Sequence, residues 1–179
     1  MIILPANGFA RSEAAVAILI EKECEARRSY ARILNIRCNT DGFKDIGLTC
    51  PSAEMQEALF RATYEQVGID PTQNPSYLEA HGTGTPIGDP VEVDSISRAF
   101  CSSGRKKPLL VGSVKSNMGH SESAAGLSGV AKAIVAIQTG TIPANLHLQK
   151  PRAELEELIM EGKIKVKNPL ILATTDYSR

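Results

Sequence analysis

Apolar and polar positions along the chain predict strands that alternate with helices. The clearest helix covers residues 52–67, where Met55, Leu59, Ala62 and Val67 share one face. Glu54 suits its first turn and Gly68 can end it. Further helices are expected at 90–100 and 151–161, and short strands at 77–80, 109–112 and 163–167. This alternation indicates an α/β fold with a largely parallel sheet and helices on its faces.

Three other segments have distinctive patterns. Residues 14–20 form an apolar run that is short enough for a buried strand, although a helix is also compatible with it. Residues 32–38 alternate and predict a second strand, and 143–148 should be extended. Residues 124–137 are almost wholly apolar or small, with Lys132 as their only charge. A helix that is apolar all round is expected to be buried.

Composition narrows the functional classes. Lys plus Arg equals Asp plus Glu at 20 each in 179 residues, so no overall field points to nucleic acid. No stretch of about 18 apolar residues is present to span a membrane. The start MIILPANGF is too short and uncharged for a signal peptide, and four cysteines without CxxC spacing suggest free thiols in a reducing compartment. We therefore expect a cytoplasmic protein.

Residues 79–90, EAHGTGTPIGDP, form a glycine-rich loop between a strand and a helix. Glycine tolerates positive φ and close approach, which suits a crowded loop. His81 would stand at the carboxyl end of its strand, where open α/β sheets place ligands. Asp89 is expected to cap the following helix, with Pro90 in its first turn and Glu92 completing a capping-box-like pair.

A second polar loop, SVKSNMGH at 113–120, follows the next predicted strand. Carboxyl ends of neighbouring parallel strands emerge at one edge, so His81 and His120 could converge, joined by Lys115. A helix N-terminus disfavours imidazolium, so His120 should stay neutral and donate a hydrogen bond. Two neutral histidine donors aimed at one oxygen would make an oxyanion site.

Other uses of these residues are weaker. Taken singly, a loop histidine is more often structural, a lone lysine is more often solvated, and glycines beside a strand often serve only the turn. The three histidines lack metal-ligand spacing, so no metal is expected. GTGTPIG matches neither GxGxxG nor GxxxxGK[ST], which disfavours a phosphate loop.

The two loops together resemble the β-ketoacyl synthase (ketosynthase) family of condensing enzymes. EAHGTGTPIGDPVE and VGSVKSNMGHSESAAG carry the resemblance at the proper spacing, while ARILNIRCNTDGFKDIGLTCPS and IPANLHLQKP look most like animal-type fatty acid synthase. The resemblance implies a thiolase-like fold, an α/β/α sandwich that works as a homodimer. Residues 1–30 would end the N-terminal ketosynthase half, 31–150 would be the C-terminal half with both His motifs, and 151–179 would begin an incomplete closing segment.

The resemblance also implies roles for matching positions. His81 and His120 would stabilise the enolate formed when malonyl-ACP loses carbon dioxide, and Lys115 would organise His120 and its surroundings. Thr83 and Thr85 would touch the phosphopantetheine arm of an acyl carrier protein. The segment itself would bind no cofactor, and its partners would be the carrier domain, malonyl and acyl thioesters and the N-terminal ketosynthase half.

The chain departs from the family pattern in two ways. The family's nucleophile is a cysteine in an Ala-Cys-Ser-Ser context at the start of a helix, whereas Cys101 of Cys101-Ser102-Ser103 falls at a helix end, where the dipole opposes a thiolate. Position 129 is glycine, where some bacterial relatives have a glutamate that pairs with the lysine. We therefore expect the carboxyl-terminal half of a ketosynthase, cut at both ends, without its nucleophile. A polyketide synthase module and a non-catalytic remnant are the alternatives.

Overall fold

The computed structural model describes residues 3–4, 8–45, 47, 49–101, 104–146, 148 and 150–166. In chain order its elements are β1 (Ile3–Leu4), α1 (Ala53–Glu65), β2 (Tyr77–Glu79), α2 (Gly88–Phe100), β3 (Leu109–Gly112), α3 (Lys115–Met118), the 3₁₀ turn η1 (Glu122–Ala124), α4 (Ala125–Thr139), β4 (Lys150–Pro151), α5 (Ala153–Met160) and β5 (Ile164–Val166). Within these residues no helix is long and apolar enough to cross a membrane.

A three-stranded parallel sheet stands at the centre of the fold. Its strand order is β2-β3-β5, and Glu79 of β2 lies opposite Gly112 of β3. β1 and β4 form a separate antiparallel pair. The predicted strands at 77–80 and 109–112 are confirmed, as is the part of 163–167 that the structure describes, and so is the parallel arrangement.

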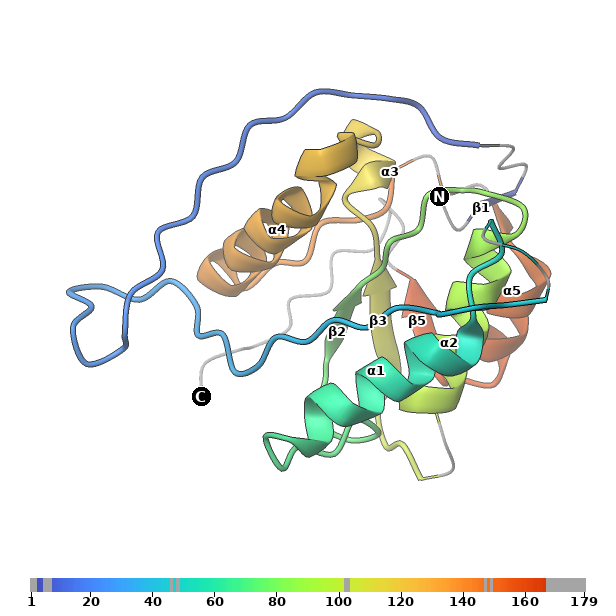
Figure 1. Ribbon diagram of the computed structural model, residues 1–179, viewed down its shortest axis with the longest axis horizontal. Helices are drawn as coiled ribbons and strands as arrows, with labels where there is room; N and C mark the ends of the chain where they lie inside the picture. The colour runs from blue at the N-terminus through green and yellow to red at the C-terminus, as the bar shows by residue number, and fades with distance from the viewer. Residues whose placement is uncertain are drawn as a thin grey trace.

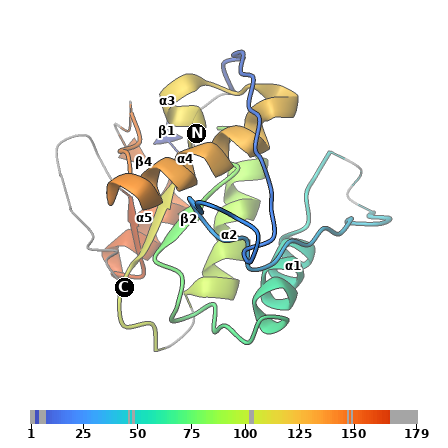
Figure 2. The same ribbon diagram turned by 90° about the vertical axis from the view of Figure 1, so that its left-hand side faces the viewer.

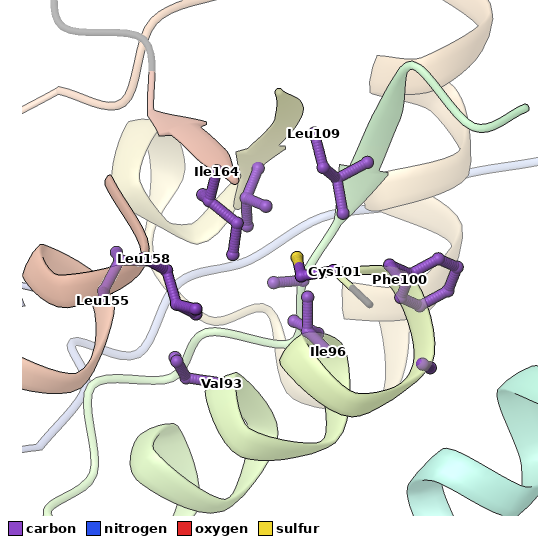
Figure 3. Close-up of a cluster of buried hydrophobic side chains, with 11 residues drawn as sticks. Val93, Ile96, Phe100, Cys101, Leu109, Leu155, Leu158 and Ile164 are labelled. Carbon is purple, nitrogen blue, oxygen red and sulfur yellow. The ribbon is translucent and has the colours of Figure 1, made fainter. Parts of the chain in front are cut away.

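The hydrophobic core lies between the sheet and the helices α2 and α5 (Figure 3). Leu109 and Val111 of β3 point into it together with Ile96 and Phe100 of α2. α1 packs on the outside of α2, while α4 lies on the opposite side of the sheet (Figures 1 and 2). The alternate residues of β2 and β3 therefore face α4, and this face carries the polar groups described below.

The helices predicted at 52–67 and 151–161 are confirmed. The Ser52 hydroxyl accepts a hydrogen bond from the Met55 amide at 3.2 Å and caps α1. Gly68 follows the helix with φ 66°, a conformation that favours glycine. Leu155 and Leu158 bury the inner face of α5.

The strands predicted at 14–20 and 32–38 are wrong, since neither segment is strand or helix in the structure. Leu19 and Ile36 are 84% and 85% exposed. A strand requires a partner backbone, and the described residues supply none here. Side chains make local links instead: Asn35 donates to the Thr63 carbonyl at 2.7 Å, which ties this segment to α1.

Two loop predictions also change. α2 begins at Gly88 rather than after Asp89, its N-cap residue is Ile87, and the Asp89 carboxylate accepts from Gly84 instead of capping the helix. The predicted polar loop at 113–120 contains the short helix α3. In the first loop the Gly84 amide donates to the Asp89 carboxylate, and in the second the Ser116 amide and hydroxyl both donate to the Ser113 carbonyl.

The helix predicted at 124–137 is present as α4, but it is not buried on all sides. Its inner face carries Ser128 and Lys132, whereas Val135 and Ile137 are 54% and 53% exposed. The extended segment expected at 143–148 contains no strand in its described part. Ser102, Ser103, His147 and residues 167–179 lie outside the described residues.

Candidate functional site

The two polar loops leave the same edge of the sheet, as predicted. The Ala80 amide donates to the Gly112 carbonyl at 2.7 Å, which continues the pairing of β2 with β3 to the point where the loops begin. The Ser113 hydroxyl then donates to the His81 carbonyl at 3.3 Å. Parallel pairing of β2 and β3 thus places the start of one loop next to the start of the other.

His81 and His120 meet at this edge. Their ring centroids are 5.7 Å apart and their planes are perpendicular. His120 is buried, whereas part of the His81 residue reaches solvent. The structure therefore brings together the two histidines that the sequence placed on separate loops.

His120 is held by its backbone and by one ring nitrogen. Nδ1 accepts a hydrogen bond from the Glu122 amide at 3.0 Å, so a neutral ring carries its proton on Nε2. The His120 amide donates to the Ala10 carbonyl at 2.8 Å, and the Ser12 amide donates to the His120 carbonyl at 2.9 Å. A side chain at Gly119, whose φ is 81°, would meet the Ala10 carbonyl at 3.0 Å. The ring can donate only through Nε2.

His81 is held through its backbone by Glu92 of α2. The two carboxylate oxygens of Glu92 accept from the amides of His81 and Gly82, at 2.6 and 2.8 Å. Desolvation lowers the pKa of His81, and the positive charge of Lys115 and the proximity of His120 lower it further. Near neutral pH His81 is therefore uncharged and able to donate a hydrogen bond.

Lys115 is the buried first residue of α3, directly beyond β3. Burial lowers the pKa of Lys115, the carboxylates of Glu79 and Glu92 oppose that effect, and Lys132 adds to it. Its positive charge is, after desolvation, a cause of the lowered pKa of His81, so Lys115 lies within electrostatic range of that histidine.

Thr83 and Thr85 lie in the loop after His81, with their hydroxyl oxygens 3.5 Å apart. Thr83 is buried, and the Thr85 hydroxyl accepts from the Gly88 amide at 3.1 Å. Below them the Asp89 carboxylate accepts from the Gly84 amide at 2.9 Å, and Arg152 donates to the Thr85 carbonyl at 3.4 Å. The loop is thus anchored on its inner side by charged side chains.

Several supporting residues were not predicted from the sequence. Buried Asn145 accepts from the Ser113 amide at 3.0 Å and from the Ser116 hydroxyl at 3.2 Å, and Arg152 reaches the first loop from the start of α5. Asn145 lies in the IPANLHLQKP segment quoted for the resemblance, but the local sequence predicts the contacts of neither residue, because each reaches the loops from a distant part of the chain. Glu92 stood out only as a helix cap.

Cys101 is unsuited to act as a nucleophile. It is buried at the C-terminal end of α2, and burial raises the pKa of its thiol. His81 lies beyond the other end of α2, and a 13-residue helix is about 20 Å long. Among the described residues there is no group of three or more His, Cys, Asp or Glu side chains that could hold a metal ion.

The arrangement offers two hydrogen-bond donors and a cation at one place. The pKa of His81 is lowered, the Nδ1 atom of His120 accepts a hydrogen bond and leaves Nε2 to donate, and the Lys115 charge acts on His81. Fixed donors of this kind stabilise an oxygen on which negative charge develops.

The chain is similar to synthases of fatty acids and polyketides. It is 47% identical over 134 residues to a fatty acid synthase of Anser anser anser, covering 75% of this chain and 38% of that protein. It is 45% identical over 154 residues to the hybrid PKS-NRPS synthetase pyvA of Aspergillus violaceofuscus, covering 83% of this chain and 4% of that protein. The chain thus spans well under half the length of these relatives.

Solved ketosynthases share the fold. The oxazolomycin ketosynthase domain of Streptomyces albus superposes with a TM-score of 0.84 at 29% identity, over 93% of this chain and 29% of that one. A ketosynthase from module 6 of the bacillaene synthase of Bacillus subtilis gives a TM-score of 0.60 at 42% identity, over 65% of this chain and 20% of that one. The expected thiolase-like α/β fold is confirmed.

The profile described as "Beta-ketoacyl synthase, C-terminal domain" matches residues 30–149. That range contains both histidine loops and the parallel strands that bring them together. The chain therefore belongs to the β-ketoacyl synthase family.

Proposed function

We propose that this chain is the C-terminal part of the ketosynthase of an animal-type fatty acid synthase. The reaction is the decarboxylative Claisen condensation of an acyl thioester with malonyl-ACP. The observation that carries the proposal is the perpendicular pair of His81 and His120 at the sheet edge, where the Lys115 charge lowers the pKa of His81.

The chemistry requires a place for negative charge. When the malonyl thioester loses carbon dioxide, the electrons of the broken C–C bond form an enolate whose charge rests largely on the thioester oxygen. The enolate carbon then attacks the acyl thioester, and the C–S bond to the enzyme cysteine breaks to release a thiolate. The first step, which builds this negative charge, is the one that hydrogen-bond donors to the oxygen would stabilise.

His81 and His120 are suited to that step because both can donate without being charged. The pKa of His81 is lowered, and the Nδ1 atom of His120 is occupied as an acceptor, which leaves Nε2–H to donate. Removing one such donor typically costs roughly 10²–10³ in rate. The Lys115 ammonium contributes a fixed positive charge to the same place.

The remaining substrate contacts and partners follow from the same reaction. Thr83 and Thr85 lie next to His81 and would contact the phosphopantetheine arm of the acyl carrier protein. The nucleophilic cysteine would come from an N-terminal ketosynthase half, because Cys101 faces the core with a raised pKa. The complete ketosynthase would act as a homodimer, and this segment would bind no cofactor of its own.

A polyketide synthase module is the second candidate. It is supported by relatives such as the highly reducing polyketide synthase gloL of Glarea lozoyensis, 42% identical over 166 residues. The complete synthase, supplied with acetyl and malonyl thioesters and NADPH, distinguishes the two. A saturated unbranched fatty acid as the product supports the first, and a partly reduced or methylated chain supports the second.

The mechanism is tested with His81→Ala and His120→Ala in the complete ketosynthase. Each variant should lose roughly 10²–10³ in the rate of malonyl-ACP decarboxylation, because one donor to the enolate oxygen is gone. Acyl transfer to the upstream cysteine should continue, since these rings act on the malonyl group.

Asn74→Ala, in the exposed turn before β2, is the matched control and should leave both rates unchanged. Carbon dioxide release is followed with labelled malonyl-ACP, and acyl transfer by trapping the acyl-enzyme. Normal decarboxylation by either histidine variant would refute the assignment.

A further inference from the structure

Glu79 is a charged residue next to the candidate site that the proposed reaction does not yet use. It is the last residue of β2, two positions before His81. Leu78 packs against the core, so alternation along the strand turns Tyr77 and Glu79 toward α4. The Glu79 side chain is mostly buried. A carboxylate in this position needs partners of its own.

The Glu79 carboxylate joins three elements. Oε1 accepts a hydrogen bond from the amide of Val114, the residue directly before Lys115. Oε2 lies 2.9 Å from the buried Lys132 ammonium of α4 and also accepts from the Tyr77 hydroxyl. One side chain of the strand that leads to His81 thus holds both the backbone at Lys115 and the helix that follows His120.

Two glycines leave room for this cluster. A Cβ at Gly129 of α4 would lie 3.1 Å from Cγ of Glu79, and one at Gly112 would lie 2.7 Å from the Tyr77 hydroxyl. Neither glycine has a positive φ, so both are required for the absence of a side chain rather than for a turn conformation. The packing of β2, β3 and α4 is therefore fitted around the Glu79 carboxylate.

The charges that face Lys115 come from the same cluster. Glu79 of β2 and Glu92 of α2 raise the pKa of Lys115, whereas Lys132 of α4 lowers it; burial in turn raises the pKa of Glu92. Glu92 is engaged by the amides of His81 and Gly82, and the charge of Glu79 is the counterpart of Lys132. The electrostatic potential at Lys115 therefore depends on the charge of the Glu79 carboxylate and on the separation of the two groups.

We propose that Glu79 is a positioning residue of the condensing reaction: its carboxylate fixes the backbone at Lys115 through the Val114 amide and supplies negative charge that keeps the Lys115 ammonium beside His81. This inference rests on the proposed function. Burial lowers the pKa of Lys115, and Glu79 is foremost among the groups that oppose this. Loss of the Glu79 charge should therefore let Lys115 lose its proton at a lower pH.

The test uses Glu79→Gln in the complete ketosynthase. Glutamine keeps the size of the side chain but not its charge, so the turnover rate for malonyl-ACP decarboxylation should fall about tenfold while KM changes little, because charged hydrogen bonds are the stronger ones. The alkaline limb of the pH profile should move to lower pH. In hydrogen–deuterium exchange, the peptide that contains Val114 should exchange about tenfold faster.

Glu57→Gln is the matched control. Glu57 pairs with Arg61 on the surface of α1 at 2.8 Å, so this change removes the same charge from an ion pair away from the site. It should alter neither the pH profile nor the exchange of the Val114 peptide.

Glu79→Gln leaves Lys132 buried without its counter-charge, which can unfold the protein. The double variant Glu79→Gln with Lys132→Met removes both charges at similar volume and restores folding. Lys132 lowers the pKa of Lys115 by less than Glu79 raises it. In the double variant the alkaline limb of the pH profile should therefore occur at a lower pH than in the wild type and at a higher pH than in Glu79→Gln.

Two results would overturn the inference. One is a folded Glu79→Gln or double variant whose alkaline limb and Val114 exchange equal those of the wild type. The other is a variant that only melts at lower temperature with an unchanged pH profile, which would make Glu79 a structural residue. Absence of decarboxylation in the wild-type protein would instead refute the proposed function, so the two failures are distinguishable.

Discussion

The helix α4 presents its apolar side to solvent in this chain and its polar side to the sheet. Ser128 and Lys132 are buried, whereas Leu127, Val130, Val135 and Ile137 are 44%, 42%, 54% and 53% exposed. This is the reverse of an ordinary surface helix. We therefore predict that the isolated chain 1–179 is a poorly stable protein that exposes this face.

The magnitude follows from these exposures. A fully exposed aliphatic residue presents roughly 150–180 Å², so the four residues leave about 300 Å² of apolar surface wet, worth roughly 7 kcal/mol at about 25 cal/mol per Å². A complete domain is stable by only about 5–15 kcal/mol. The stabilisation that this face forgoes is therefore a large part of the free energy of unfolding of a typical domain. The exposed apolar residues within 14–36 add to it.

The perturbation is to replace these four residues with glutamine. In purified 1–179 the change should reduce binding of a hydrophobic dye and aggregation measured by light scattering, because it removes apolar surface that has no partner. In the complete ketosynthase the same change should lower stability by several kcal/mol if the rest of the protein covers this face, because each buried amide then lacks a partner.

Dye fluorescence and light scattering measure the first effect, and thermal melts followed by circular dichroism measure the second. A sharp two-state melt of monomeric wild-type 1–179 without dye binding would refute the reasoning. An unchanged melt of the quadruple variant in the complete ketosynthase would show that the rest of the protein does not cover this face.

Two further predictions concern the chemistry. Purified 1–179 should condense no acyl and malonyl thioesters, and Cys101→Ser should leave the complete ketosynthase active, because burial raises the pKa of that thiol; acyl labelling of Cys101 by mass spectrometry would contradict this. Desolvation and then the Lys115 charge hold the pKa of His81 below 6.5, so decarboxylation should be lost only as the pH falls through that lowered value. Lys115→Met removes one of these effects and should move the acid limb to higher pH, and an acid limb that stays in place would show that the lysine charge does not reach His81.

Local pattern was sufficient for most of the regular elements. The apolar faces of α2 and α5 and the short runs of β2, β3 and β5 are readable because each element buries one side against a single core. The predicted face of α1 was wrong, because α1 packs on the core through Phe60 and Tyr64 while Val67 is exposed. The meeting of His81 and His120 could also be predicted, because parallel neighbours send their carboxyl ends to one edge. Two loop motifs and their spacing were enough to indicate the family.

Tertiary structure alone decided the rest. Residues 14–20 and 32–38 have strand-like patterns but no strand partner among the described residues, and pairing is not a local property. Asp89 does not cap the helix as predicted, and its carboxylate accepts a hydrogen bond from the Gly84 amide instead. Glu79 is the first residue of the EAHGTGTPIGDP motif, but nothing in the motif predicts its partners. Its position between Val114 and Lys132 exists only once β2, α3 and α4 are packed, because polar partners are determined by distance in space rather than along the chain.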